Sequence, residues 1–313
     1  MKAGAFVVDN LFRGLAAAGR LHPLADPARH GVEVLRDLSY REGGAVEHLL
    51  DIWRPLHAAR PMPIVFYVHG GGFRFLSKDT HWVMALSFAR AGYLVFNVSY
   101  RLAPRHPFPA AVEDVCEAWG FAVARAAEYG GDLSRVVVSG ESAGANLATT
   151  LTLAACYRRP EPFARALFDL GVVPRACVPI CGLLQVSDTA RFARRRKMSR
   201  FVADRMEEVG DAYLSGHDAA TPAELELADP LRVLERGEPP ARPLPPFFTA
   251  VGTRDPVLDD TRRLKLALDR MGVPCEARYY SGEPHAFHAL VFRKNARACW
   301  RATFDFLERT LGR

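Results

Sequence analysis

Buried strands and amphipathic helices alternate along most of this chain, and few folds accommodate that pattern. The segments 63–68 and 93–100 are continuous apolar runs, typical of strands that are buried on both faces of a parallel sheet. A helix is expected between them over 79–91, with Asp79 as its cap and Gly92 after its end. A strand, a helix and a second strand in this order predict an α/β fold with a parallel sheet.

The alternation extends from about residue 33 to the C-terminus. It opens with two strands, VEVLRDL and VEHLLDIW, which are joined at 41–45 and predict a hairpin. Further strands are expected at 135–139, 176–181, 247–252 and 276–280, and further helices at 109–129, 143–157, 260–271 and near the C-terminus. We therefore predict about eight strands in one mostly parallel sheet that is flanked by helices.

Two segments stand outside the alternation, residues 1–32 and 187–235. Both carry apolar side chains at helical spacing: Phe6, Leu11, Phe12 and Leu15 in the first, and Phe192, Phe201, Met206 and Val209 in the second. We predict that they form a helical cap over the carboxyl ends of the strands, and that 33–186 and 236–313 form the core. The alternative is that they are peripheral helices with no part in a binding site.

Composition indicates a protein that can bury a large core, with 49% hydrophobic and 24% charged residues among 313. The net charge is +6, and six cations lie in 191–200, at Arg191, Arg194, Arg195, Arg196, Lys197 and Arg200. We interpret this cluster as a solvated helix face, although it could also attract an anionic surface or substrate. No nucleic-acid-binding module accompanies it, so no nucleic-acid partner is predicted.

The beginning of the chain and its cysteines bear on location and redox state. The apolar stretch Ala3–Val8 is too short for a signal-peptide core or a membrane span, so we predict a cytoplasmic protein with no stable membrane insertion. The six cysteines mostly lie in apolar segments, which favours buried free thiols over disulfides or zinc ligands. Cys177 and Cys181 come closest to a pair, and we predict no metal there.

The sharpest motif is VVVSGESAGANLA, where Gly140, Ser142 and Gly144 form G-x-S-x-G between an expected strand and an expected helix. Such a turn must be tight to lift the serine hydroxyl above the sheet, and flanking glycines remove the Cβ atoms that would collide. The helix N-terminus also favours negative charge at Ser142. We predict that Ser142 is a catalytic nucleophile.

A second motif, His69, Gly70, Gly71 and Gly72, follows directly on a strand. Consecutive glycines leave backbone N–H groups unshielded, so that they can bind the oxyanion of a tetrahedral intermediate together with the N–H of Ala143. The alternatives are a plain glycine-rich turn or a phosphate loop, and no G-K-[ST] follows to support the latter.

A serine nucleophile needs a histidine base that is held by a carboxylate. Asp255 follows the strand 247–252, and His285 follows the strand 276–280. Asp259 and Asp260 are rivals for the acid, but they are expected as first-turn acids of the next helix. His288 is the rival base. A place in a loop before the helix supports His285, and the family resemblance that follows is the main reason for preferring it.

Five segments, in order and spacing, resemble the hormone-sensitive-lipase-like family of bacterial esterases, which belongs to the α/β-hydrolase superfamily. They are HGGGF (69–73), YRLAPRHPFPA (100–110), GESAGANLA (140–148), DPVLD (255–259) and GEPHAFH (282–288). The resemblance covers about 33–311. It implies Ser142, Asp255 and His285 as the triad, Gly71, Gly72 and Ala143 as oxyanion donors, a helical cap and no cofactor.

The sequence departs from the family pattern at Glu141, where Asp or Thr is more usual, at Ala286, where Gly is typical, and at Arg105, where an acid is expected after YRLAP. None of these differences removes a group of the expected triad.

The expected function is hydrolysis of short- to medium-chain carboxylic esters by acyl transfer through Ser142. The same groups could cleave an amide, a lactone or a formamide, and a different class of function is a non-catalytic ligand-binding relative. No metal is expected, and the substrate would be a small-molecule ester. We also predict a homodimer through the edge strand 276–280, whose backbone groups would otherwise lack ladder partners.

Overall fold

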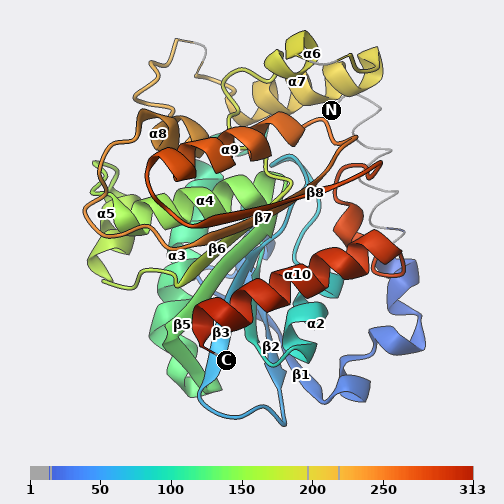
Figure 1. Ribbon diagram of the computed structural model, residues 1–313. Helices are drawn as coiled ribbons and strands as arrows, with labels where there is room; N and C mark the ends of the chain where they lie inside the picture. Colours follow the sequence, from blue (N-terminus) through green and yellow to red (C-terminus); the bar gives the residue numbers. More distant parts are fainter. Residues whose placement is uncertain (1–13, 15, 196, 218, 313) are drawn as a thin grey trace.

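The computed structural model describes residues 14, 16–195, 197–217 and 219–312. Its centre is an eight-stranded sheet with the order β1-β2-β4-β3-β5-β6-β7-β8, which confirms the predicted strand number and fold class (Figure 1). The strands are β1 (Val32–Ser39), β2 (Leu49–Pro55), β3 (Met62–Val68), β4 (Leu94–Val98), β5 (Gly131–Glu141), β6 (Ala176–Ile180), β7 (Phe247–Gly252) and β8 (Cys275–Tyr280). All neighbouring strands are parallel except that β2 runs antiparallel to both β1 and β4.

Helices cover both faces of the sheet (Figure 1). They are α2 (Trp82–Arg90), α3 (Ala110–Arg125), α4 (Ala143–Cys156), α5 (Pro162–Asp169), α6 (Arg191–Arg195), α7 (Arg200–Tyr213), α8 (Pro230–Arg236), α9 (Leu258–Arg270) and α10 (Lys294–Leu311). On one face α2 and α10 pack together, with the rings of Phe88 and Trp300 edge to face at 5.1 Å. On the other face lie α3, α4 and α9 (Figure 1).

The strands at the centre of the sheet are buried along their whole length. Every residue of β3, β4, β6 and β7 is buried. The continuous apolar runs in the sequence arise for this reason, because a strand that is covered by helices on both faces has no side that can be polar.

Two boundaries differ from the expected ones because of local turns. Helix α2 begins at Trp82 and Asp79 is not its cap, since Thr80 Oγ1 donates to the Ser77 carbonyl at 2.7 Å and holds 77–80 in a separate turn. The second strand of the hairpin begins at Leu49, because Val46–His48 forms a 3-10 turn. Helices α5 and α8 were not expected.

Helix α7 lies beyond the ends of the central strands, at the top of Figure 1. The helical residues 16–20 pack beside α2, where Trp82 Nε1 donates to the Ala16 carbonyl at 3.2 Å. Phe6, Leu11, Phe12 and Leu15 lie outside the described residues. The division expected at 235/236 falls inside α8, whose Leu231 and Leu234 pack in one apolar cluster with Leu264 of α9.

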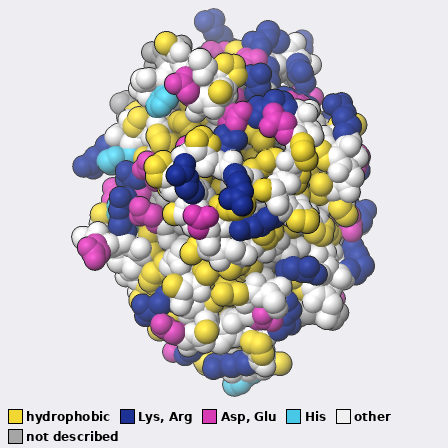
Figure 2. Space-filling view, turned by 90° about the vertical axis from the view of Figure 1, so that its left-hand side faces the viewer, with side chains coloured by type: hydrophobic (Ala, Val, Ile, Leu, Met, Phe, Trp, Pro, Cys, Tyr) yellow, Lys and Arg dark blue, Asp and Glu magenta, His cyan; other side chains and the backbone are white. Residues whose placement is uncertain are grey.

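The basic segment 191–200 is not a uniformly solvated helix face. Arg191 is buried and binds both carboxylate oxygens of Asp260 at 2.6 Å. Arg194 pairs with Asp188 at 2.6 Å, and Arg195 pairs with Asp259. Acidic side chains also lie among the Lys and Arg side chains near the upper end of the face in Figure 2. The interpretation as a solvated helix face is therefore wrong for Arg191, and the charges of Arg194 and Arg195 are paired with acids.

The cysteines are free thiols, and Cys177 and Cys181 lie in different apolar clusters. The six are Cys116, Cys156, Cys177, Cys181, Cys275 and Cys299, and all but Cys275 are buried. Among the described residues, no helix combines the length and apolar composition that crossing a membrane requires.

Candidate active site

Ser142 occupies a sharp turn between β5 and α4. Its backbone has φ 55° and ψ −116°, a conformation that residues other than glycine rarely adopt. The Ser142 N–H donates to the Ile180 carbonyl on the neighbouring strand at 3.0 Å. The turn therefore anchors the backbone of Ser142 on the sheet in the strained geometry that the G-x-S-x-G motif requires.

The glycines on either side of Ser142 are required by close backbone contacts. A Cβ at Gly140 would lie 2.4 Å from the Gly144 carbonyl oxygen, and a Cβ at Gly144 would lie 2.2 Å from the Val68 oxygen. Any side chain at either position would push α4 away from the strands β3 and β5.

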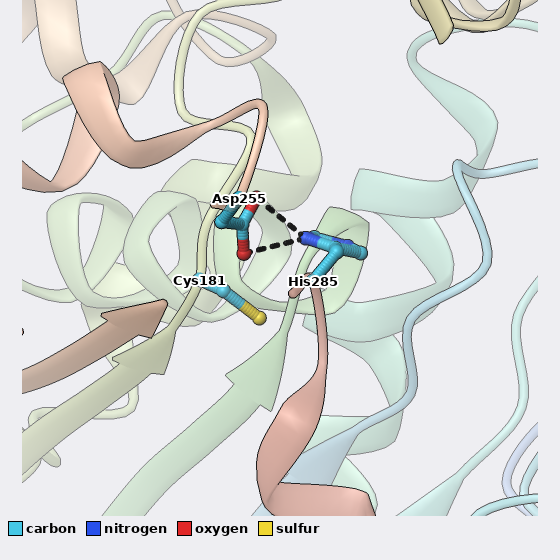
Figure 3. Close-up of side chains that lie close together, drawn as sticks. All are labelled: Cys181, Asp255 and His285. Atoms are coloured by element: carbon cyan, nitrogen blue, oxygen red, sulfur yellow. Dashed lines mark hydrogen bonds and ion pairs between the residues drawn. The ribbon is translucent and has the colours of Figure 1, made fainter. Parts of the chain in front are cut away.

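The structure brings Ser142, His285 and Asp255 together. The Ser142 hydroxyl lies 2.9 Å from His285 Nε2, and His285 Nδ1 lies 2.9 Å from both oxygens of Asp255. Asp255 comes from the turn after β7 and His285 from the loop after β8, as Figure 3 shows for these two residues. With Nδ1 donating to the carboxylate, Nε2 is free to accept the proton of the hydroxyl.

The carboxylate of Asp255 is buried and also accepts a hydrogen bond from the Val257 N–H at 2.9 Å. Burial by itself would lower the pKa of His285, but the charge and hydrogen bond of Asp255, together with the charge of Glu141, raise it above its ordinary value. Ala286 has φ 54°, so this position needs the left-handed conformation that glycine adopts most readily.

The rival residues have other partners. Asp259 pairs with Arg195 and Asp260 with Arg191, both in the first turn of α9 as expected. His288 is buried and lies 3.0 Å from Glu141 through its Nε2. Of the two histidines, it is therefore His285 that faces the Ser142 hydroxyl.

The glycine loop after β3 lies beside Ser142. Gly71 has φ 115° and Gly72 has φ 58°, and a Cβ at Gly71 would lie 2.0 Å from the Phe75 oxygen. Both glycines line the same cavity as Ser142, and Ala143 is the first residue of α4. The three residues that the family resemblance implies as donors are thus placed around the nucleophile.

His69 and Gly70 support this loop from behind. The His69 ring is buried, stacks on Tyr100 with centroids 4.2 Å apart, and lies 2.7 Å from the Gly70 carbonyl through Nδ1. The Tyr100 hydroxyl donates to the His69 carbonyl at 2.8 Å. His69 therefore holds the backbone of the glycine loop in place.

Sequence reasoning missed a buried charge cluster behind the nucleophile. Glu141 lies 2.9 Å from His81 Nε2 through one oxygen and 3.0 Å from His288 Nε2 through the other. Burial alone would raise the pKa of Glu141, but the two histidines hold it well below the ordinary value. The only signal in the sequence was Glu141 itself, an acid next to the nucleophile at a position where the family pattern usually has Asp or Thr.

Cys181 is a second residue that sequence reasoning did not connect with the site. Its thiol lies against the Asp255–His285 pair (Figure 3), and one ligand atom from each of the three residues lies within 4.8 Å of the others. Burial raises the pKa of Cys181 well above its ordinary value, so the sulfur carries its proton. A protonated thiol is a poor metal ligand, and Asp255 and His285 are already hydrogen-bonded to each other.

Ser142 and His285 open into a cavity of about 510 Å³. Its walls are mainly apolar and come from the segment after the glycine loop, from α2, α7 and the loop after β8. The apolar contributors include Phe75, Leu76, Met84, Met206, Val209 and Leu290. Helix α7 contacts the glycine loop, since a Cβ at Gly72 would lie 2.8 Å from Val209.

Comparison with known proteins identifies the family. Residues 65–289 match the family described as alpha/beta hydrolase fold. The chain belongs to this family. The α/β-hydrolase is 30% identical over 284 residues to the carboxylesterase NlhH of Mycobacterium tuberculosis, an alignment that covers 88% of this chain and 81% of NlhH.

Solved structures of esterases resemble this α/β-hydrolase along nearly its whole length. The crystal structure of the esterase LipW from Mycobacterium marinum has a TM-score of 0.75 and 26% identity, and covers 99% of this chain and 90% of LipW. An esterase from the bacterial hormone-sensitive lipase family has a TM-score of 0.71 and 25% identity, with 97% and 90% covered. The predicted resemblance to that family is therefore confirmed.

Proposed function

We propose that this α/β-hydrolase is a carboxylesterase that uses Ser142, His285 and Asp255 to hydrolyse short- to medium-chain esters. The observation that carries the proposal is the unbroken series of hydrogen bonds from the Ser142 hydroxyl through His285 to Asp255, at the edge of an apolar cavity. The similarity of the chain to a curated carboxylesterase and to esterase structures supports ester hydrolysis as the reaction.

In the first step, Nε2 of His285 takes the proton of Ser142 as Oγ attacks the ester carbonyl carbon. The carbonyl π electrons move to the oxygen, and the tetrahedral intermediate forms. When it collapses, the bond to the alcohol oxygen breaks, and the imidazolium returns its proton to the leaving alcohol. Asp255 keeps Nδ1–H oriented and stabilises the imidazolium throughout.

In the second step, water enters the site and loses a proton to His285 as it attacks the acyl-enzyme. Collapse of the second intermediate releases the carboxylic acid and returns the proton to Ser142. In each intermediate the oxyanion would accept hydrogen bonds from the N–H groups of Gly71, Gly72 and Ala143. The N-terminus of α4 adds a favourable dipole.

The proposed chain length follows from the cavity. A volume of about 510 Å³ with mainly apolar walls suits a substrate of modest size whose acyl or alcohol part is apolar. A maximal rate on long triglyceride chains would contradict this part of the proposal.

The test compares wild type, Ser142→Ala and Ser134→Ala on ester, amide and lactone substrates. Removing the nucleophile should lower kcat on a short-chain 4-nitrophenyl ester by about 10⁴-fold or more. Ser134 lies at the exposed far end of β5, so Ser134→Ala should keep wild-type activity. Retained hydrolysis in a folded Ser142→Ala, or a preference for amides in the wild type, would refute the proposal.

We also propose that two copies of the chain form a homodimer through β8. The strand lies at one edge of the sheet and pairs only with β7 among the described strands. Such an edge favours pairing with a second copy, and sedimentation as a monomer would contradict it. The cytoplasmic location stays a prediction, to be checked by cell fractionation.

A further inference from the structure

Arg205 of α7 is the only Lys or Arg among the described residues that line the cavity around Ser142 and His285. The acyl-transfer steps above do not use it. A cation in the wall of a mainly apolar cavity carries a desolvation cost, so its partners reveal what it can bind.

The partners of Arg205 leave two of its nitrogens unused. Nη2 donates to Glu208 on the same helix, and the guanidinium lies 5.6 Å from the centre of the Phe201 ring. Nε and Nη1 are buried and have no hydrogen-bond partner among the described residues. A buried donor without an acceptor is costly, so a movement of the Arg205 side chain that gave these nitrogens an acceptor in the cavity would be favourable.

Glu208 is shared with a second arginine. Arg74, from the segment after the glycine loop, lies 3.4 Å from Glu208, and the Nε of Arg74 is also buried without a partner among the described residues. Among the described residues, two guanidinium groups thus face one carboxylate at this wall, and the second positive charge favours an anion in the adjacent cavity.

Glu141 is the only acid among the described residues that line the cavity. Its two oxygens are bound by His81 and His288, so it does not pair with Arg205. The planar fork of a guanidinium matches a carboxylate, to which it can donate two parallel hydrogen bonds. The wall therefore fits a carboxylate better than it fits a neutral polar group.

We propose that Arg205 selects esters that carry a carboxylate in addition to the scissile bond, a specificity that rests on the proposed esterase function. The apolar walls would hold the chain between the two groups, and Arg205 would bind the charged end. Dicarboxylic acid half-esters, and esters of alcohols that bear a carboxylate, are the two substrate classes with this chemistry.

Two matched substrate pairs test the proposal. Mono-4-nitrophenyl adipate against 4-nitrophenyl hexanoate varies the charge in the acyl part. The butyrate ester of 4-hydroxybenzoate against that of 4-hydroxybenzamide varies it in the alcohol part. The readout is the ratio of kcat/KM for the anionic substrate to that for the neutral one in each pair.

In Arg205→Met this ratio should fall by about 10- to 100-fold in at least one pair, the factor expected for a lost charge-assisted hydrogen bond. Glu208→Gln should raise the ratio, because it removes the competing carboxylate. Arg194→Met is the matched control, since Arg194 is exposed and pairs with Asp188, and it should leave the ratio at the wild-type value.

If the ratio in Arg205→Met equals the wild-type ratio in both pairs, the proposed role of Arg205 is overturned. Hydrolysis of the neutral esters would still support the esterase function. If the wild type cleaves none of the four esters, the esterase proposal itself fails. Should Arg205→Met not fold, the salt dependence of the wild-type ratio serves as the second test. A ratio that falls as salt rises supports the charge interaction, and a ratio independent of salt overturns it.

Discussion

Asp255 controls two properties of His285. It determines which ring nitrogen carries the proton, and it sets how readily the ring accepts a second proton. Both follow from two 2.9 Å contacts between its buried carboxylate and Nδ1. Since these contacts raise the pKa of His285, the ring becomes protonated, and thus inactive as a base, at a higher pH than an ordinary histidine.

The kcat/KM for a neutral ester should therefore rise with pH through a value above the ordinary histidine pKa of about 6.5. Asp255→Asn removes the charge that raises this pKa, so the acid limb should move to lower pH while the plateau falls by about 10³- to 10⁴-fold. A pH profile of kcat/KM measures both effects. Asp259→Asn, which removes a surface partner of Arg195, should leave the limb in place, and a shift there would count against the assignment.

Glu141 is expected to stabilise the protein more than its position next to the nucleophile suggests. It binds His81 and His288 from inside the core, so Glu141→Gln should lower the free energy of unfolding by about 1–3 kcal/mol at neutral pH. Because the folded-state pKa of Glu141 is lowered, its contribution is present above the unfolded-state value and is lost as pH falls through the folded-state pKa.

Urea unfolding of wild type and Glu141→Gln at neutral and acid pH measures this contribution. The difference between the two proteins should shrink at the acid end of the range. Glu207→Gln on the exposed side of α7 is the matched control. A difference that grows as pH falls would contradict the proposed charge cluster.

At the scale of elements, the turn from β5 to α4 depends on how closely the helix approaches the sheet. A Cβ at Gly144 would lie 2.2 Å from the Val68 oxygen, so Gly144→Ala should cost about 1–3 kcal/mol of stability and displace Ser142. Gly120 in α3 has open space around its Cβ position, and Gly120→Ala should be neutral or stabilising by up to about 1 kcal/mol. Thermal unfolding and ester hydrolysis of the two variants measure the contrast, and equal effects would contradict it.

The boundaries of helices and strands were predictable where a residue type in the sequence ends the element. The strand 247–252 was found with its expected bounds, because an apolar run ends there at Gly252. Helix α2 starts three residues later than expected, since side-chain hydrogen bonds between Ser77 and Thr80 take the preceding residues into a turn. Competition of this kind depends on which local bonds form, and composition does not reveal it.

At the scale of the whole molecule, Arg191 joins the segment 187–235 to the core. Both the guanidinium and the Asp260 carboxylate are buried, and Asp260 also accepts from the Leu184 N–H at 2.8 Å. Arg191→Met should lower the free energy of unfolding by about 3–5 kcal/mol, because it removes the cation that is hydrogen-bonded to the buried carboxylate and leaves only the more distant Arg263 at 3.6 Å.

Denaturant unfolding of Arg191→Met, Asp260→Asn and the double variant tests this linkage. The double variant should lose less than the sum of the single losses, since the uncompensated charge is gone. Burial raises the pKa of Asp260, so its carboxylate becomes protonated as the pH falls. The loss of stability in Arg191→Met should therefore be smaller at acid pH, where the charge is gone. Additive losses would indicate that the two side chains stabilise the protein independently.

Local pattern was enough to predict the strands, their order of occurrence, the turn at Ser142 and the glycine loop, because periodicity and turn chemistry act between residues that are close in the chain. It also predicted the neighbourhood of Asp255 and His285, since parallel strands end at a common edge. The histidine pair on Glu141, the Arg191–Asp260 bond and the exposure of Arg205 to the cavity followed from packing alone. His81 and Glu141 are 60 residues apart in the chain, and Arg191 and Asp260 are 69 apart. Only the folded protein takes these charged groups out of water, and burial is what makes their pairing necessary.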